Sequence, residues 1–123
     1  VHALAYPIGG HYKVPHGVSN ALVLPAVLRF NAVTAPQPYA EIAACAFPNL
    51  AGLGTQDAAF GFAEAMADLC KRCGLQQTLR EIGIDRDALV MLARDAMKQT
   101  RLLVNNPREM TEADALAIYE AVW

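Results

Sequence analysis

The sequence is poor in charge and in long apolar runs, and each shortage excludes a class of protein. Only 18% of the 123 residues are charged, the net charge is -2, and no basic run is longer than Lys71-Arg72. A nucleic-acid partner therefore has no electrostatic support. The longest apolar run, residues 21–28, is interrupted by Pro25 and is too short to span a bilayer. The first residues also lack the charged segment of a signal peptide. We expect a cytoplasmic protein that binds neither nucleic acid nor membrane.

Cysteine is scarce, and its number is odd. The three cysteines are Cys45, Cys70 and Cys73, which make a poor disulfide framework and indicate a reducing compartment. Cys70 and Cys73 match a C-x-x-C motif, so a zinc or redox role has to be weighed. A structural zinc site would need a second pair of ligands. We interpret the two cysteines as neighbours on one face of a helix.

Strand patterns are absent, because no alternating β-branched run is bounded by turn signals. Helical spacing of apolar residues covers most of the chain instead. In chain order, the predicted helices are 17–30, kinked or divided at Pro25; 39–47; 55–73, with Thr55 or Asp57 as cap and Gly74 as stop; one or two turns within 75–82; a helix capped by Asp85; and 112–122, capped by Thr111. Residues 101–107 are predicted to form a loop. The expected fold is an all-α domain of five to six helices.

Apolar residues make up 54% of the chain, which is high for a domain of this size. Because a small domain exposes much of its surface, either the fold is unusually buried or part of its apolar surface is covered by something else. One hypothesis that follows is a non-catalytic helical module that self-associates through an exposed apolar face.

Two histidines lie fourteen positions apart in the first segment. His2 is in a run of small apolar residues, and His16 lies between Pro15 and Gly17. A predicted Pro-Ile-Gly-Gly turn at residues 7–10 would bring the two imidazoles to face one cation. Neutral imidazole nitrogens are donors that divalent metals favour. Gly9 and Gly10 would permit close backbone approach.

The pattern H-A-x-A-x-P-x-G-G-x-x-x-x-P-H-G-x-x-N-A-x-x-L-P-x-V-x-x-F-N over residues 2–31 resembles the C-terminal helical domain of the iron-containing (group III) alcohol dehydrogenases. The end of the chain is similar too, with Asn106-Pro107-Arg108, Thr111 and a last amphipathic helix. The resemblance extends over essentially all 123 residues, and the first 31 carry its specific motif.

The resemblance implies a dehydroquinate-synthase-like helical domain within a two-domain enzyme. An N-terminal domain would bind NAD or NADP, and the helical domain would hold one Fe(II) or Zn(II). The metal ligands would be an aspartate and three histidines, of which His2 and His16 match the last two. The aspartate, the first histidine and the nucleotide-binding domain are then expected before residue 1. The enzyme would transfer a hydride between an alcohol or aldehyde and NAD(P), and residues 1–123 alone should be inactive.

Three further residues need an interpretation. Tyr6 stands where many members of the family have a histidine near the substrate, so it is a candidate catalytic residue, although a packing role is an equal alternative. A phenol is a poorer base at neutral pH than imidazole. His11 is interpreted as a loop residue, with a small zinc site of His2, His11 and His16 as the alternative. Arg108 is expected in a turn held by an ion pair, the alternative being contact with a substrate carboxylate. A homo-oligomer is an open possibility.

Overall fold

The computed structural model describes residues 1–123, and it is built from helices without any strand. The α-helices are α1 (His2–Tyr12), α2 (His16–Ala32), α3 (Pro36–Ala46), α4 (Thr55–Arg72), α5 (Leu89–Met97), α6 (Thr100–Leu103) and α7 (Glu112–Ala121). Single 3-10 turns lie at Pro48–Leu50, Arg80–Ile82 and Arg86–Ala88. The all-α prediction is confirmed, with seven helices rather than five to six. None of them combines the length and the hydropathy needed to cross a membrane.

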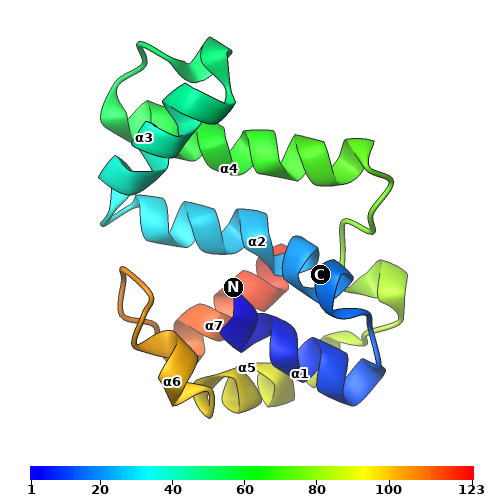
Figure 1. Cartoon of the computed structure of the whole chain (residues 1–123). Coiled ribbons are helices and arrows are strands. Elements are labelled where there is room, and N and C mark those ends of the chain that lie inside the picture. The colour runs from blue at the N-terminus through cyan, green and yellow to red at the C-terminus, as the bar shows by residue number, and fades with distance from the viewer.

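Helix α2 lies between two groups of helices (Figure 1). Helices α3 and α4 pack on one side of it, and α1, α5 and α7 lie on the other. The main core of 19 buried residues is on the second side, and it includes Leu4, Val23, Leu92 and Tyr119. On the first side Phe62 of α4 packs against Tyr39 and Phe47. The α1–α2 pair is therefore anchored by core residues from the far end of the chain.

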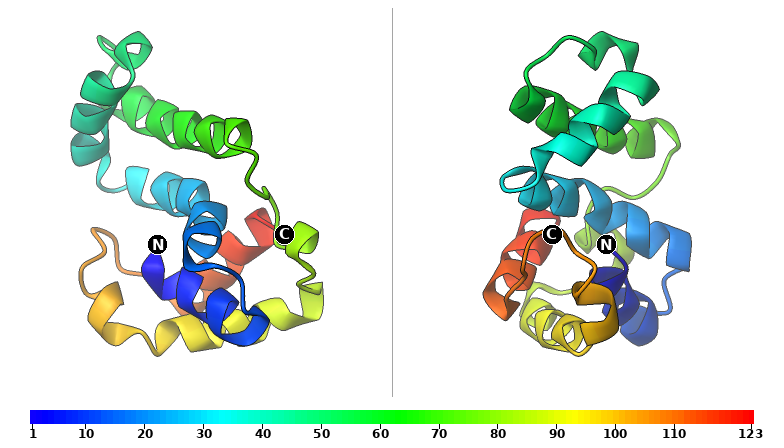
Figure 2. Two further views of the ribbon diagram at one scale, coloured as in Figure 1. Left: turned by 45° about the vertical axis from the view of Figure 1, so that its right-hand side comes forward. Right: turned by 60° about the vertical axis from the view of Figure 1, so that its left-hand side comes forward.

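Residues 7–10 are helical, so the predicted turn between the two histidines is wrong. Helix α1 continues through Pro7, Gly9 and Gly10 to Tyr12. The chain reverses at Lys13, which has φ of 54°, and residues 13–15 run back along α1 (Figure 2). A Cβ on Gly9 would lie 3.4 Å from the carbonyl oxygen of Val14, whereas a Cβ on Gly10 would meet nothing within 4 Å. The close approach expected of both glycines is thus a property of Gly9 alone.

The other helix predictions are confirmed in part. Helix α2 runs through Pro25 without a break and bends, which agrees with the kink expected at this proline (Figure 2). Helix α4 begins at Thr55 after Gly54, so neither Thr55 nor Asp57 is its cap. The segment 75–82 has one helical turn, at residues 80–82, as predicted, whereas the predicted loop 101–107 contains most of α6. Gly74, with φ of 73°, follows the end of α4 as predicted.

The N-terminus of α7 has the cap predicted at Thr111. The Thr111 hydroxyl accepts a hydrogen bond from the Asp114 backbone N–H, and the Asp114 carboxylate accepts one from the Thr111 N–H. This capping box satisfies two helix-end donors that would otherwise lack partners.

Thr111→Ala is expected to lower the free energy of unfolding by about 1 kcal/mol, the usual cost of losing such a cap. Urea denaturation followed by circular dichroism measures this change. Thr34→Ala, at an exposed threonine in the turn after α2, is the matched control, and an equal loss in both variants would contradict a capping role.

Candidate metal centre

His2 and His16 are the first residues of α1 and α2, and the fold places their side chains together. The centroids of the two imidazole rings are 5.1 Å apart. The Tyr6 ring lies one turn along α1 from His2, 5.7 Å from the His16 ring and 6.2 Å from the His2 ring. All three side chains are exposed. The two histidines lie together, as predicted from the sequence. A short return of the chain, and not a glycine turn, brings them together.

The spacing of the two rings fits shared coordination of one ion. Because a zinc–imidazole nitrogen bond is about 2.0–2.1 Å long, two rings on one tetrahedral ion have centroids roughly 5 Å apart. The distance between the His2 and His16 rings agrees with this value. Both rings are at the surface, so an ion can reach them without a rearrangement of the core.

Asn20 is a neighbour of His16 that sequence reasoning missed. Its side-chain nitrogen lies 3.1 Å from Nε2 of His16 and donates a 2.8 Å hydrogen bond to the His16 carbonyl oxygen. Its side-chain oxygen is buried and has no hydrogen-bond partner. The same side-chain nitrogen lies 3.4 Å from Nδ1 of His16, so the Asn20 amide lies against the ring as a donor and does not accept a ring N–H. The i, i+4 spacing of His16 and Asn20 is the signal that could have found it.

The electrostatics of the pair call for an anionic ligand. Both histidines stand at helix N-termini, whose partial positive charge opposes cation binding. Neither α1 nor α2 has an acidic residue in its first turn. Nowhere in residues 1–123 do three or more His, Cys, Asp or Glu side chains form a metal-binding group. The pair is therefore an incomplete centre, and a carboxylate is the donor that would best offset the helix ends.

A pocket of about 240 Å³ opens beside His2. Its lining is mostly apolar, with Leu102 and Leu103 of α6 and Met110 facing Ala3 and Leu4 of α1. The polar part of the lining consists of His2, Asn105 and Asn106. A pocket lined by apolar residues and a few polar groups is the usual form of a small-molecule site. The pocket can take a small molecule that has both an apolar and a polar part.

The loop that follows α6 is fixed to α2 by a pair of amides. Asn31 is only 2% exposed and donates to the side-chain oxygen of Asn106 at 2.9 Å, and Asn106 donates back at 2.8 Å. Asn31 also donates to the Tyr39 hydroxyl, and Asn106 donates to the Arg108 carbonyl oxygen. This network holds one wall of the pocket against the core.

Arg108 also attaches the loop that follows α6 to α2. Its guanidinium donates to the Phe30 carbonyl oxygen at 2.8 Å and lies 3.8 Å from the centroid of the Phe30 ring. The expected turn is present, but a carbonyl oxygen and an aromatic ring, not an ion pair, hold it. The arginine side chain is thereby engaged away from the His2 pocket, whose lining does not include it.

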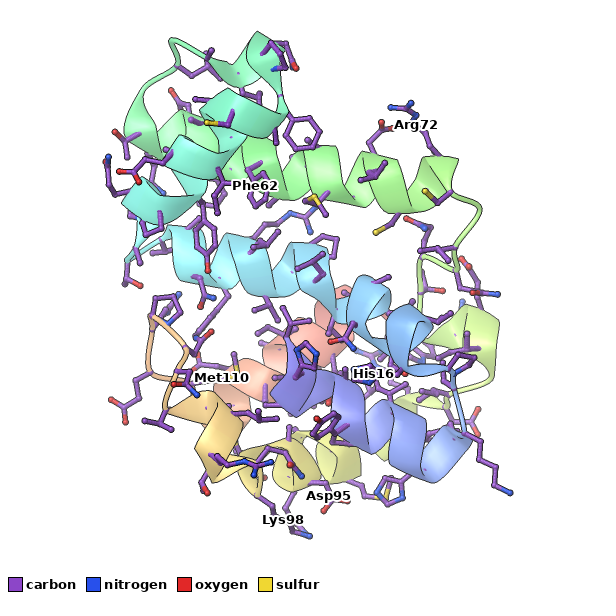
Figure 3. All side chains as sticks on the ribbon, in the orientation of Figure 1. His16, Phe62, Arg72, Asp95, Lys98 and Met110 are labelled. Carbon is purple, nitrogen blue, oxygen red and sulfur yellow. The ribbon has the colours of Figure 1, made fainter.

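His11 and the cysteines lie outside the centre. His11 Nε2 is 2.6 Å from a carboxylate oxygen of Asp95 on α5, and no three-residue metal group includes it, so the three-histidine zinc alternative is wrong. Figure 3 shows Asp95 of α5 and Lys98, the residue that follows α5, and the two form an ion pair. Cys70 and Cys73 are free thiols at the end of α4, the first buried and the second exposed.

The stability of the α1–α5 contact should depend on pH through Asp95. Hydrogen bonds from Lys98 and then from His11 lower the pKa of its carboxyl below the ordinary value of 3.8. A lowered pKa in the folded state stabilises the fold above pH 3.8, and this stabilisation is lost as the pH falls through that value and through the folded-state pKa. Thermal unfolding of Asp95→Asn should therefore lose stability near neutral pH and fall less steeply below about pH 4. Parallel curves for the variant and the parent would contradict this role.

Comparison with known proteins matches the whole chain to one family. The family model described as "Fe-containing alcohol dehydrogenase family, C-terminal" matches residues 1–123. The 1,3-propanediol dehydrogenase of Klebsiella pneumoniae is 38% identical over 97% of this chain and 30% of its own length. Long-chain-alcohol dehydrogenase 1 of Geobacillus thermodenitrificans is 37% identical over 100% of this chain and 31% of its own. The alcohol dehydrogenase from Oenococcus oeni superposes with a TM-score of 0.92 at 34% identity, covering 99% of this chain and 32% of that one. The chain thus spans about a third of the length of these relatives.

Proposed function

The chain belongs to the iron-containing alcohol dehydrogenase family, and we propose that it is the C-terminal part of the helical, metal-binding domain of such an enzyme. The intact protein would transfer a hydride between an alcohol or aldehyde and NAD or NADP. The nucleotide would be held by the part of the enzyme that residues 1–123 do not include. The observation that carries the proposal is the pairing of the His2 and His16 rings, 5.1 Å apart, at the starts of two helices.

His2 and His16 would be two of the protein ligands of one Fe(II) or Zn(II) ion. The bound cation would supply a Lewis acid that polarises the substrate oxygen. The positive helix ends at both histidines support an aspartate among the other ligands, together with a further histidine. Asn20 would keep the His16 ring in orientation, since its amide touches that ring.

Tyr6 would be the side chain closest to the ligands that can exchange a proton. Its ring is 5.7 Å from that of His16 and is 41% exposed, so its hydroxyl is open to a substrate or to water. We propose that Tyr6 hydrogen-bonds to the alcohol or aldehyde near the metal. A hydrogen-bonding role needs no unusual acidity, whereas service as a general base at neutral pH would.

The pocket beside His2 would hold the carbon chain of the substrate. Its apolar lining suits an alkyl group, and His2 at one end suits a polar group directed to the metal. The named relatives act on a small diol in one case and on long-chain alcohols in the other. Chain length is therefore a property in which members of this family differ, and it would be set partly by this pocket.

Two observations bear on the cellular compartment and the assembly of the intact enzyme. The three free cysteines support a reducing compartment, and we place the protein in the cytoplasm. Ile42, Leu53 and Val104 are 49%, 48% and 77% exposed, which supports their being covered by the rest of the enzyme or by a second copy in a homo-oligomer. The alternative of a non-catalytic module requires self-association through such residues, so a monomer in sedimentation at high concentration would contradict that alternative.

A chimera tests the proposed function. Residues 1–123 replace the matching part of the Klebsiella 1,3-propanediol dehydrogenase, and alcohol oxidation coupled to NAD(P) is measured. We expect activity in the chimera and none in residues 1–123 alone, which offer two of the four proposed ligands. His16→Ala in the chimera should lower the activity by more than the roughly tenfold to hundredfold loss that is typical when a residue in contact with a metal ligand is replaced. His11→Ala should retain activity. The proposal would be contradicted if the chimera folds but is no more active than its His16→Ala variant.

A further inference from the structure

We infer that Leu103 and Met110 form a wall that limits the length of the alkyl chain admitted beside His2. This inference rests on the proposed function, because it takes the pocket beside His2 as the site of the substrate's carbon chain. A second hollow of about 420 Å³ is lined by residues of α6 and of the segments before and after it. Leu103, Asn106 and Met110 line both the pocket and this hollow. Residues that border two cavities at once are the partition between them.

The partition has one fixed part and one removable part. Asn106 is held by its amide pairing with Asn31 and cannot move without breaking hydrogen bonds to the core. Leu103 is half-buried and Met110 is 8% exposed, and both are flexible apolar side chains without a polar anchor. Met110 belongs to the segment that links α6 to α7 (Figure 3). The wall can therefore be opened by shortening either apolar side chain.

The hollow beyond the wall suits a continuation of an alkyl chain. Its lining includes Met97 and Val104, with Thr100 and Glu109 as polar neighbours. The pocket beside His2, at about 240 Å³, is smaller than the roughly 300–1,000 Å³ of typical ligand sites. A short alcohol fills it, and a longer chain meets Leu103 and Met110. Removal of the wall would join the pocket to the hollow and give the longer chain an apolar path.

Affinity for straight-chain alcohols should show this limit. Each methylene that becomes buried tightens binding about fourfold. In the parent protein the gain should stop once the chain end reaches the wall, while in Leu103→Ala it should continue for several more carbons. Leu102→Ala is the matched control, because Leu102 is the preceding residue of α6, is also half-buried, and lines only the pocket beside His2.

The experiment is a titration of the 123-residue chain with butanol, hexanol and octanol, followed by methyl NMR. Ala3 and Leu4 report on the pocket beside His2, and Met97 reports on the hollow beyond the wall. We expect all three alcohols to shift the Ala3 and Leu4 methyl signals of the parent. Octanol should shift the Met97 methyl signal in Leu103→Ala, but not in the parent or in Leu102→Ala. Met110→Ala is the second wall variant, and octanol should shift its Met97 signal as well. It takes the place of Leu103→Ala if Leu103→Ala fails to fold.

The two possible failures are distinguishable. If the alcohols shift Ala3 and Leu4 equally in every variant and never reach Met97, the wall is overturned and the proposed substrate pocket stands. If octanol already shifts Met97 in the parent, the wall is also overturned. If no alcohol shifts Ala3 or Leu4 in any variant, the pocket does not hold the carbon chain, and this part of the proposed function fails together with the inference.

Discussion

Replacing His16 with alanine is expected to weaken the binding of Zn²⁺ to the 123-residue chain by about a hundredfold, because the second donor of a chelating pair binds in an intramolecular step. The rings of His2 and His16 are already side by side in the folded chain, so little order has to be created when an ion binds. Isothermal titration with Zn²⁺ at neutral pH measures the loss. His2→Ala should show a loss of the same size.

His11→Ala is the matched control for this measurement. His11 is also an exposed histidine of α1, but its ring faces Asp95 and not the other two histidines. We expect the zinc affinity of His11→Ala to equal that of the parent. An equal loss in all three alanine variants would mean that the ion binds to scattered surface histidines, and it would remove the pair as a centre. Absolute affinity should be modest in every case, since a two-ligand site lacks the closed shell of a structural zinc site.

Asn31→Ala is expected to lower the free energy of unfolding by about 2–3 kcal/mol, because it leaves buried polar partners without hydrogen bonds. Asn31 is 2% exposed, and its amide joins the side chains of Asn106 and Tyr39. After the substitution Asn106 keeps only its bond to the Arg108 carbonyl oxygen. Urea denaturation gives the change in free energy, with its slope showing whether the folded state stays compact.

Asn49→Ala serves as the control for Asn31→Ala. Asn49 is an exposed asparagine in the 3-10 turn after α3, and a surface substitution of this kind usually changes stability by less than about 0.5 kcal/mol. A cost for Asn31→Ala no larger than that of Asn49→Ala would show that the amide pair contributes nothing net. In the expected case, the Met110 methyl signal should also shift in Asn31→Ala, since Asn106 and Met110 belong to the same wall of the pocket.

The features that the sequence predicts well are those determined by neighbouring residues. The capping box at Thr111 and the stop at Gly74 depend on side chains or φ angles within one turn of the helix end. The glycines at residues 9 and 10 mislead for the opposite reason. Locally they indicate a turn, but both lie within α1. Helix α1 packs against α2 and α5, and such tertiary packing overrides a weak local preference.

The candidate centre also has some features that the sequence predicts and others that it does not. The meeting of His2 and His16 is predictable because the motif that contains both spans only fifteen residues. The pocket beside His2 is not predictable, because two of its apolar lining residues, Leu102 and Leu103, lie in the predicted loop 101–107. The partners of His11 and Asn31 lie 84 and 75 positions away. Pairings over such distances leave no trace in local spacing, so the roles of His11, Asn31 and Asn106 become visible only in the folded chain.

The ring nitrogens of the three histidines provide the most direct test of the metal centre. A long-range proton–nitrogen NMR spectrum of the uniformly labelled chain reports on each imidazole separately as Zn²⁺ is added. The account predicts that one ring nitrogen each of His2 and His16 shifts together at the same zinc concentration, while the nitrogens of His11 stay in place. Zinc-dependent shifts in His11, or in only one of His2 and His16, would contradict a shared site at the starts of α1 and α2.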